Sequence, residues 1–123
     1  MEKSEAEKYR KKLLKERERI HAEMEDIEQD IAYDDTRLGQ SELADYDNHP
    51  ADTGTETFIK ERDLAVRDSF RDILGRIDEA MGKIDRGTYG TCDRCGRQIT
   101  KGRLDTVPYA IYCVGCQDII EGR

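Results

Sequence analysis

The sequence has few of the residues from which a thick globular core is built. It contains no Trp, two Phe and two Pro, and 36% of its residues are hydrophobic while 40% are charged. This balance disfavours a large core but is usual for long solvated helices, because a narrow apolar stripe is enough to pair them. No stretch approaches the roughly 18 apolar residues of a membrane-spanning helix, and the start of the chain lacks the apolar run of a signal peptide. We therefore expect a cytoplasmic protein without a membrane segment.

Positive charge is also scarce. The chain has 21 Lys and Arg against 28 Asp and Glu, which gives a formal net charge of −7. Attraction to the phosphates of nucleic acid requires clustered Lys and Arg, so we expect a protein partner, for example one with a basic channel or groove. The imbalance is strongest at residues 39–59, which contain no Lys or Arg. The carboxylates of this stretch belong to Glu42, Asp45, Asp47, Asp52 and Glu56.

Cysteine occurs only in two C-x2-C pairs, which are separated by 17 residues. The pairs are Cys92 with Cys95 and Cys113 with Cys116. This spacing is typical of a four-thiolate zinc site, which brings two tight turns together through a loop of roughly 15–20 residues. A closed set of four thiolates leaves no open position for catalysis, so we predict one structural Zn²⁺. A redox dithiol or a disulfide pair is the alternative; both are less expected without a secretory signal and with two pairs at this spacing.

The residues around the cysteines predict a small zinc-finger module at positions 88–123. Gly96 fits the turn after the first pair, and residues 97–99 and 109–112 could form short strands. Cys116 would then open a short terminal helix over residues 117–121, which gives a treble-clef-like arrangement. With zinc bound, the charges of residues 92–123 nearly cancel, whereas a surface that follows phosphates should be distinctly basic. We therefore expect no sequence-specific DNA binding from this module.

The first third of the chain predicts one long helix over about residues 4–38. Ser4 and Glu7 fit a capping box at its start, and Gly39 is a plausible stop. The apolar residues follow a 3.5-residue period, which is typical of a coiled-coil seam. These residues are Leu13, Ile20, Met24, Ile27, Ile31 and Leu38.

A second helix with a matching period is predicted over about residues 54–86. Its apolar residues are Ile59, Val66, Phe70, Ile73, Ile77, Ala80 and Ile84, with Leu74 and Met81 widening the stripe. An acidic tip loop at residues 39–53 separates the helices, since Pro50 pushes the residue before it out of helical geometry. We therefore predict a mainly α protein in which residues 1–87 form a long antiparallel coiled-coil hairpin.

The sequence offers no candidate catalytic residue. It has no Ser/His/Asp or Cys/His nucleophile arrangement with supporting context and no glycine-rich phosphate loop, so we expect no enzyme. His21 is expected to face solvent. The acidic loop is the remaining candidate site, because a rigid arm that ends in carboxylates can carry negative charge into a recess that holds a divalent ion or basic residues. A solvated turn without a partner is the alternative.

The hairpin, the acidic loop and the C-x2-C-x17-C-x2-C spacing together resemble the DksA/TraR family of four-cysteine zinc-finger proteins. The similarity is densest over residues 77–116, including GTYGTC at residues 87–92. Residues 46–52 look like the YteA-type branch of Gram-positive bacteria. The resemblance implies that the coiled coil enters the secondary channel of RNA polymerase and tunes transcription initiation without contacting DNA.

The resemblance also implies a role for the tip of the hairpin. The best-known family members carry an Asp-x-x-Asp-x-Ala tip; counted back from the first cysteine, His49, Asp52 and Gly54 fall on its three defined positions. One of the three is therefore kept. Asp52 is the expected tip residue, with His49 and Asp47 beside it. The alternative function is an interaction adaptor, a coiled coil with a structural zinc whose partner is not polymerase; a DNA-binding zinc protein is a weaker third option.

Overall fold

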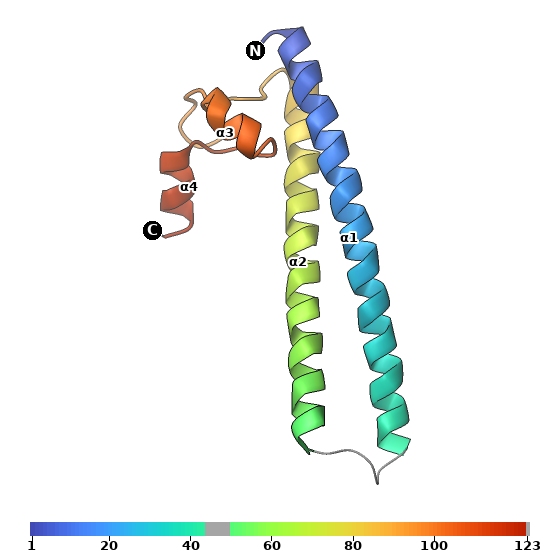
Figure 1. Cartoon of the computed structure of the whole chain (residues 1–123). Coiled ribbons are helices and arrows are strands. Elements are labelled where there is room, and N and C mark those ends of the chain that lie inside the picture. Colours follow the sequence, from blue (N-terminus) through green and yellow to red (C-terminus); the bar gives the residue numbers. More distant parts are fainter. Residues whose placement is uncertain (44–49, 123) are drawn as a thin grey trace. The chain divides into compact units, whose positions relative to one another are not determined.

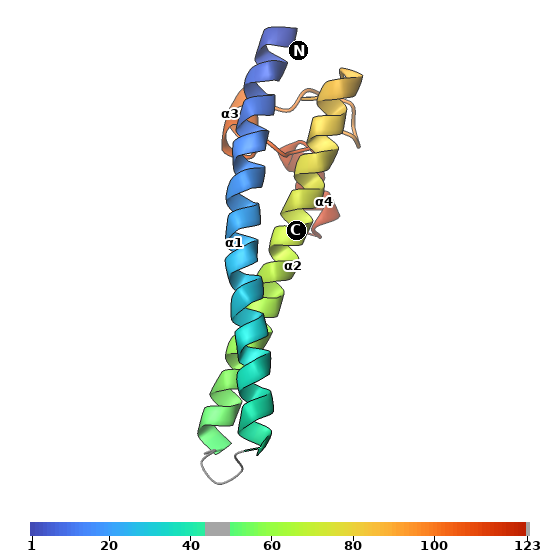
Figure 2. The same ribbon diagram turned by 90° about the vertical axis from the view of Figure 1, so that its right-hand side faces the viewer.

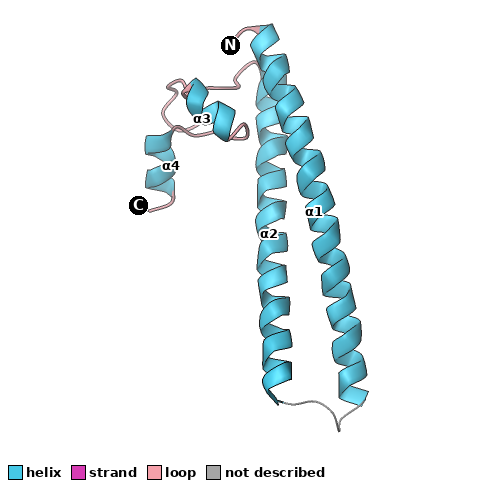
Figure 3. Cartoon of the chain, in the orientation of Figure 1, coloured by secondary structure: helices cyan, strands magenta, loops and turns pink. Residues whose placement is uncertain are grey.

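The protein is mainly helical in the parts that its computed structural model describes. The backbone is described for residues 1–43 and 50–122, and the side chains for residues 1–33 and 54–122. Within these ranges no strand forms, and the one extended pairing is an isolated antiparallel bridge between Thr91 and Gln98. The helices are α1 (Lys3–Leu43), α2 (Pro50–Arg86), α3 (Lys101–Thr106) and α4 (Val114–Ile120) (Figures 1 and 3). The prediction of a mainly α fold is confirmed.

The first of two compact units combines Met1–Glu18 with Asp72–Arg123. In it the start of α1 and the end of α2 lie side by side and run in opposite directions (Figures 1 and 2). Arg10 of α1 pairs with Asp85, and Arg17, two turns later in α1, pairs with Asp78 at 3.4 Å. The partner number falls along α2 as the α1 number rises, which is the register of an antiparallel pair.

The second unit is Arg19–Arg71, and within it α1 and α2 are again antiparallel neighbours. Arg71 reaches Glu28 at 3.6 Å. Ile20 and Ile31 are buried, and Met24 lies half-buried between them, as the predicted seam requires. Charged side chains cover the outer faces, so this pair of helix segments depends on a narrow apolar contact.

The core of the first unit follows the predicted seams and extends them. Leu13, Ile77 and Ala80 are fully buried, and Leu74 is buried beside them, so the apolar stripe is wider at this end of α2. Each fully buried Leu or Ile side chain stabilises the fold by roughly 1.5–3 kcal/mol relative to exposure. In the second unit, by contrast, the predicted seam residue Ile59 is 36% exposed.

The helix boundaries around the predicted tip loop differ from the sequence-based expectation. α1 passes through Gly39 and ends at Leu43, and α2 begins at Pro50, before the expected start near residue 54. The stop at Gly39 is wrong because a glycine costs only about 1 kcal/mol in a helix interior, which does not end a long helix by itself. Pro50 opens a helix here because the first helical position needs no N–H and suits the fixed φ of proline. The division of the chain at residue 87 stays a prediction.

The end of α2 is fixed by a glycine. Gly87 has φ +76°, a left-handed conformation that glycine adopts without strain. Its N–H donates to the carbonyl of Ile84 at 3.1 Å, and the N–H of Thr88 donates to that of Lys83 at 2.8 Å. These two bonds form a Schellman motif, which satisfies the last carbonyls of the helix and turns the chain towards the first cysteine.

Candidate metal centre

The two cysteine pairs, separated by 17 residues in the sequence, come together in the first unit. All four are free thiols, and their sulfur atoms lie within 4.8 Å of one another. The Sγ atoms of Cys95 and Cys113 are 3.8 Å apart, much farther than the roughly 2.05 Å of a disulfide. A tetrahedral zinc ion with sulfurs at about 2.3 Å places neighbouring sulfurs about 3.8 Å apart, so the thiols fit the predicted metal. Cys92, Cys95, Cys113 and Cys116 would hold one structural Zn²⁺.

The first pair of cysteines lies in a tight turn closed by backbone hydrogen bonds. The N–H of Gly96 donates to the carbonyl of Cys92 at 3.0 Å, and Gly96 has φ +76°. The N–H of Cys92 in turn donates to the carbonyl of Arg97 at 2.8 Å. The predicted strand at residues 97–99 is reduced to the single bridge between Thr91 and Gln98, which this bond makes together with the 2.7 Å bond from the N–H of Ile99 to the carbonyl of Gly90.

The second pair of cysteines lies at the start of α4. Cys113 is the N-cap residue, and Cys116 is buried in the first turn, so the helix begins before the predicted residue 117. No strand forms at residues 109–112, where the prediction placed one. This segment instead joins the two cysteine pairs, since Ile111 accepts a 2.9 Å hydrogen bond from the N–H of Asp93.

Between the two pairs lies α3, a helix that the sequence analysis missed. The side chain of Thr100 accepts from the N–H of Arg103 at 3.3 Å and caps its start, while Leu104 is buried. The sequence signal for this helix is a capping Thr followed four residues later by an apolar residue, but the same pattern is common in loops of this composition. Such a short helix depends on its tertiary contacts.

The surroundings of the sulfurs favour thiolates at two positions. Burial opposes ionisation of the Cys92 thiol, but backbone N–H groups, including that of Cys95, donate to its sulfur and lower its pKa to about 6. The N–H of Cys116 likewise lowers the pKa of Cys113. At Cys116 itself, the Arg94 guanidinium donates to Sγ at 3.7 Å, yet burial and the neighbouring thiols raise the pKa to about 11. A divalent metal favours deprotonation of every thiol that it binds.

A buried lysine ties the end of α2 to the first cysteine pair. Lys83 is 1% exposed and is the one buried charged side chain among the residues whose side chains are described. Its Nζ donates to the carbonyl of Thr91 at 2.7 Å and pairs with the Asp93 carboxylate. Thr91 and Asp93 flank Cys92, so the last turn of α2 holds both sides of the first predicted ligand. Burial of Lys83 was not predicted from the sequence, although this residue directly precedes the apolar Ile84 at the edge of the stripe.

The start of α1 contacts the zinc-finger region through an aromatic pair. The ring of Tyr9 lies 5.4 Å from that of Tyr89, and the Tyr9 hydroxyl donates to Asp105 of α3 at 2.8 Å. Tyr89 donates to the carbonyl of Pro108 at 2.7 Å. Burial and the hydrogen bond to Asp105 raise the pKa of Tyr9 to about 12. The protonated Tyr9 hydroxyl is therefore part of the native contact.

Replacing Tyr9 by Phe tests this contact. We expect Tyr9→Phe to lower the free energy of unfolding by about 1 kcal/mol at pH 8, the usual value of one intramolecular hydrogen bond. A raised pKa means that the folded state holds the proton more tightly. The difference in unfolding free energy between the wild type and Tyr9→Phe should therefore be constant below pH 10 and shrink as the pH rises from 10 through 12. Urea unfolding measures it, with exposed Tyr33→Phe as the matched control; equal stability of the two variants would refute the contact's contribution.

The structure describes little of the three predicted tip residues. Asp47 and His49 lie outside the described residues, and of Asp52 the structure describes only the backbone, within α2. Their assignment as contact residues stays a prediction. His21 is exposed, as expected. None of the described helices is both long and apolar enough to cross a membrane.

Comparison with known proteins places the chain in a family. Residues 87–122 match the prokaryotic dksA/traR C4-type zinc finger. An uncharacterized protein of Aquifex aeolicus is 34% identical over 128 residues, which cover 98% of this chain and 79% of that protein. The chain belongs to the DksA/TraR family of C4-type zinc-finger proteins. The predicted family and the structural zinc are both confirmed.

Two further relatives and one solved structure are also similar to this chain. Bacillus subtilis YteA is 41% identical over 69 residues, in line with the predicted YteA-like branch, and the match covers 56% of this chain and 29% of YteA. The RNA polymerase-binding transcription factor DksA of Haemophilus influenzae is 32% identical over 84 residues, 68% of this chain and 57% of that protein. The structure of transcription factor DksA2 from Pseudomonas aeruginosa has a TM-score of 0.69 at 24% identity, covering 98% of this chain and 85% of that one, and it supports the fold.

Proposed function

We propose that this protein is a non-enzymatic, cytoplasmic zinc-binding transcription regulator that binds RNA polymerase through its helical hairpin. The observation that carries the proposal is the pairing of two long antiparallel helices with a four-cysteine cluster, in a chain of the DksA/TraR family. A relative, the DksA of Haemophilus influenzae, is an RNA polymerase-binding transcription factor. The zinc would stabilise the region at the base of the hairpin and take no part in a reaction.

The charge distribution supports a protein partner over DNA. The chain carries a net charge of −7, and no Lys or Arg occurs at residues 39–59. Repulsion between this acidic stretch and a phosphate backbone disfavours DNA contact there, whereas a basic channel or a bound divalent ion would attract it. We therefore propose that Asp52, with His49 and Asp47 beside it, makes the functional contact with the partner. We also propose that the protein does not recognise a DNA sequence.

The variant Asp52→Ala tests the tip assignment. We expect it to reduce the effect on transcription about tenfold while the affinity for core polymerase falls less than about threefold, because one carboxylate contributes little to a large interface. Transcription from a set of promoters and equilibrium binding to purified core polymerase measure the two effects. Asp30→Ala, an exposed carboxylate on α1, is the matched control and should change neither.

The wild-type protein decides the broader proposal in the same assays. Binding of zinc-loaded protein to core polymerase together with a change in transcription supports it. If the protein neither binds polymerase nor alters transcription, the proposal is wrong. Recovery of a different complex from cell lysate, without any polymerase subunit, would point instead to an interaction adaptor.

A further inference from the structure

Arg94 lies between the two cysteines of the first pair, yet its side chain reaches the second pair. Its guanidinium donates to the Sγ atom of Cys116 at 3.7 Å, although the two residues are 22 positions apart in the sequence. Arg94 is exposed and Cys116 is buried. Among the residues whose side chains are described, Arg94 is the one cationic residue that donates to a cysteine sulfur. This contact therefore joins one cysteine pair to the other through a charged group.

Two of the other sulfurs accept hydrogen bonds from the backbone. The sulfur of Cys92 accepts from three backbone N–H groups, including that of Cys95. The sulfur of Cys113 accepts from the N–H of Cys116. Such bonds stabilise a thiolate because they offset the negative charge on its sulfur. Backbone donors are present whatever the side chains are, whereas the bond to the Cys116 sulfur depends on the side chain of Arg94.

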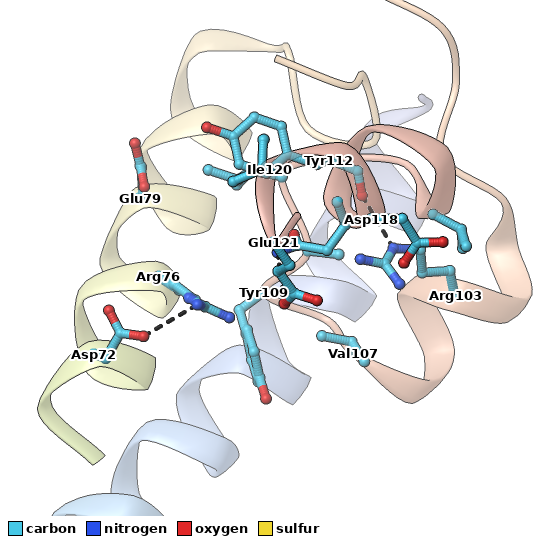
Figure 4. A pocket seen from close by; sticks show the side chains of 14 residues that line it. Asp72, Arg76, Glu79, Arg103, Val107, Tyr109, Tyr112, Asp118, Ile120 and Glu121 are labelled. Atoms are coloured by element: carbon cyan, nitrogen blue, oxygen red, sulfur yellow. Dashed lines mark hydrogen bonds and ion pairs between the residues drawn. The ribbon is translucent and has the colours of Figure 1, made fainter. Parts of the chain in front are cut away.

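The charge of a four-thiolate site makes a cationic donor important. Four thiolates and one Zn²⁺ together carry a charge of about −2, which is shared by the sulfurs. Two other cations of this region are engaged elsewhere. Lys83 pairs with the Asp93 carboxylate, and Arg103 donates to the carbonyl of Tyr112 at 3.0 Å (Figure 4). Neither of them donates to a cysteine sulfur.

The helix that carries Cys116 has no cation of its own. α4 has the sequence VGCQDII, in which Asp118, labelled in Figure 4, follows Cys116 by two positions. A carboxylate so close in the sequence adds negative charge to the helix that bears the thiolate. The positive charge at the Cys116 sulfur therefore comes from another segment of the chain, through Arg94.

We propose that Arg94 is a positioning residue of the metal centre, which keeps the Cys116 sulfur in place as a ligand and offsets the negative charge of the thiolates. A metal site loses its ion when a ligand detaches, and the guanidinium opposes detachment of Cys116 because it joins the two cysteine pairs. Arg94 would therefore slow the loss of zinc. This inference goes beyond the proposed function and does not depend on it, since every measurement below uses the protein without polymerase.

The rate of zinc transfer from the zinc-loaded protein to a competing chelator is the first test. We expect about tenfold faster transfer from Arg94→Gln, because loss of a group that hydrogen-bonds to a metal ligand typically costs roughly 10–100-fold in metal affinity. Arg94→Lys keeps the charge and should stay within about threefold of wild type. Arg97→Gln removes a second exposed cation of the same region and should stay within about twofold. The effect of Arg94→Gln should shrink as salt rises, because an exposed charge is screened.

Cobalt(II) bound in place of zinc gives a spectroscopic test that a merely structural role would not move. Charge transfer from thiolate sulfur to Co²⁺ absorbs in the near ultraviolet, and a cation that donates to the sulfur raises the energy of this transition. Arg94→Gln should therefore shift the band to longer wavelength. The ligand-field bands in the visible, which report four sulfur ligands in a tetrahedron, should stay in place. Arg94→Lys should reverse most of the shift, and Arg97→Gln should cause none.

The two measurements together decide the role of Arg94. Faster zinc transfer and a shifted band in Arg94→Gln, both reversed in Arg94→Lys, support it. Agreement of Arg94→Gln with Arg97→Gln in both measurements would overturn it, and so would faster transfer without a band shift. Equal effects of Arg94→Gln and Arg94→Lys would also overturn it, because the charge would then not matter. If Arg94→Gln binds no Co²⁺, a normal four-sulfur spectrum of Arg94→Lys supports the role and its absence overturns it.

Discussion

Removing zinc should abolish the native structure of the zinc-finger region. The purified protein is expected to hold about one zinc ion, and structural zinc contributes on the order of 10 kcal/mol to the folding of small domains of this kind. The region has little else to stabilise it, because its apolar core is small. That core consists of Tyr89, Ile99, Leu104, Ala110 and Ile111. Chelation or Cys116→Ser should therefore unfold it.

The tyrosines of the region supply the measurement. The near-UV circular dichroism of buried Tyr89, and of Tyr109 and Tyr112, should collapse on chelation, while most of the far-UV helix signal of α1 and α2 remains. Zinc added back should restore the near-UV signal. Val114→Ser, at an exposed position of α4, is the matched control and should retain zinc and structure. A metal-free protein with unchanged tyrosine signals and thermal stability would contradict the assignment of a structural zinc site.

Loss of the buried lysine should be the second large effect. Lys83→Met is expected to lower the free energy of unfolding of the zinc-loaded protein by about 2 kcal/mol, since hydrogen bonds of charged groups contribute roughly 1.5–3 kcal/mol. The Asp93 side chain is 41% exposed, so water can hydrate it when Lys83 is lost. The loss of stability should therefore be smaller than for a fully buried charge left without a partner. Zinc should also pass faster to a competing chelator, because the groups on both sides of Cys92 lose their anchor on α2.

Two variants sharpen the test of Lys83. Lys11→Met removes an exposed charge from α1 and should change stability by less than about 0.5 kcal/mol. Asp93→Asn keeps a hydrogen-bond acceptor for Lys83 and should cost less than Lys83→Met. Denaturant unfolding and the rate of zinc transfer measure both effects. The role assigned to Lys83 is wrong if Lys83→Met is as stable, and releases zinc as slowly, as Lys11→Met.

Repetition and spacing in the sequence were enough to predict the helix contacts and the cysteine cluster. The apolar period placed Leu13, Ile20 and Ile77 in the helix contacts because one face of a long helix must be buried for the pair to be stable. The cysteine spacing predicted convergence of the four sulfurs, because thiolates with this separation have few other common uses. Both signals come from many residues or from a chemically specific pattern.

Prediction from the sequence was wrong where small local preferences compete. Gly39 does not stop α1, since the cost of a glycine is about 1 kcal/mol and a long helix absorbs it. The region between the cysteine pairs contains the helix α3 and no strand within the described residues. Its conformation depends on capping by Thr100 and on the bond from Asp93 to Ile111, contacts that are not visible before the chain is folded. Lys83 was missed because a lysine at a helix end is usually solvated.

Direct binding to purified core RNA polymerase is the measurement that tests the proposed function most simply. Zinc-loaded protein and core polymerase, without DNA, are mixed and separated by size-exclusion chromatography, and the polymerase fractions are assayed for the protein and for zinc. A stable complex in which protein and zinc are present in equal amounts is the predicted result. Elution of the zinc-loaded protein entirely apart from polymerase, at concentrations where a control relative such as DksA co-elutes with its own polymerase, would contradict the account.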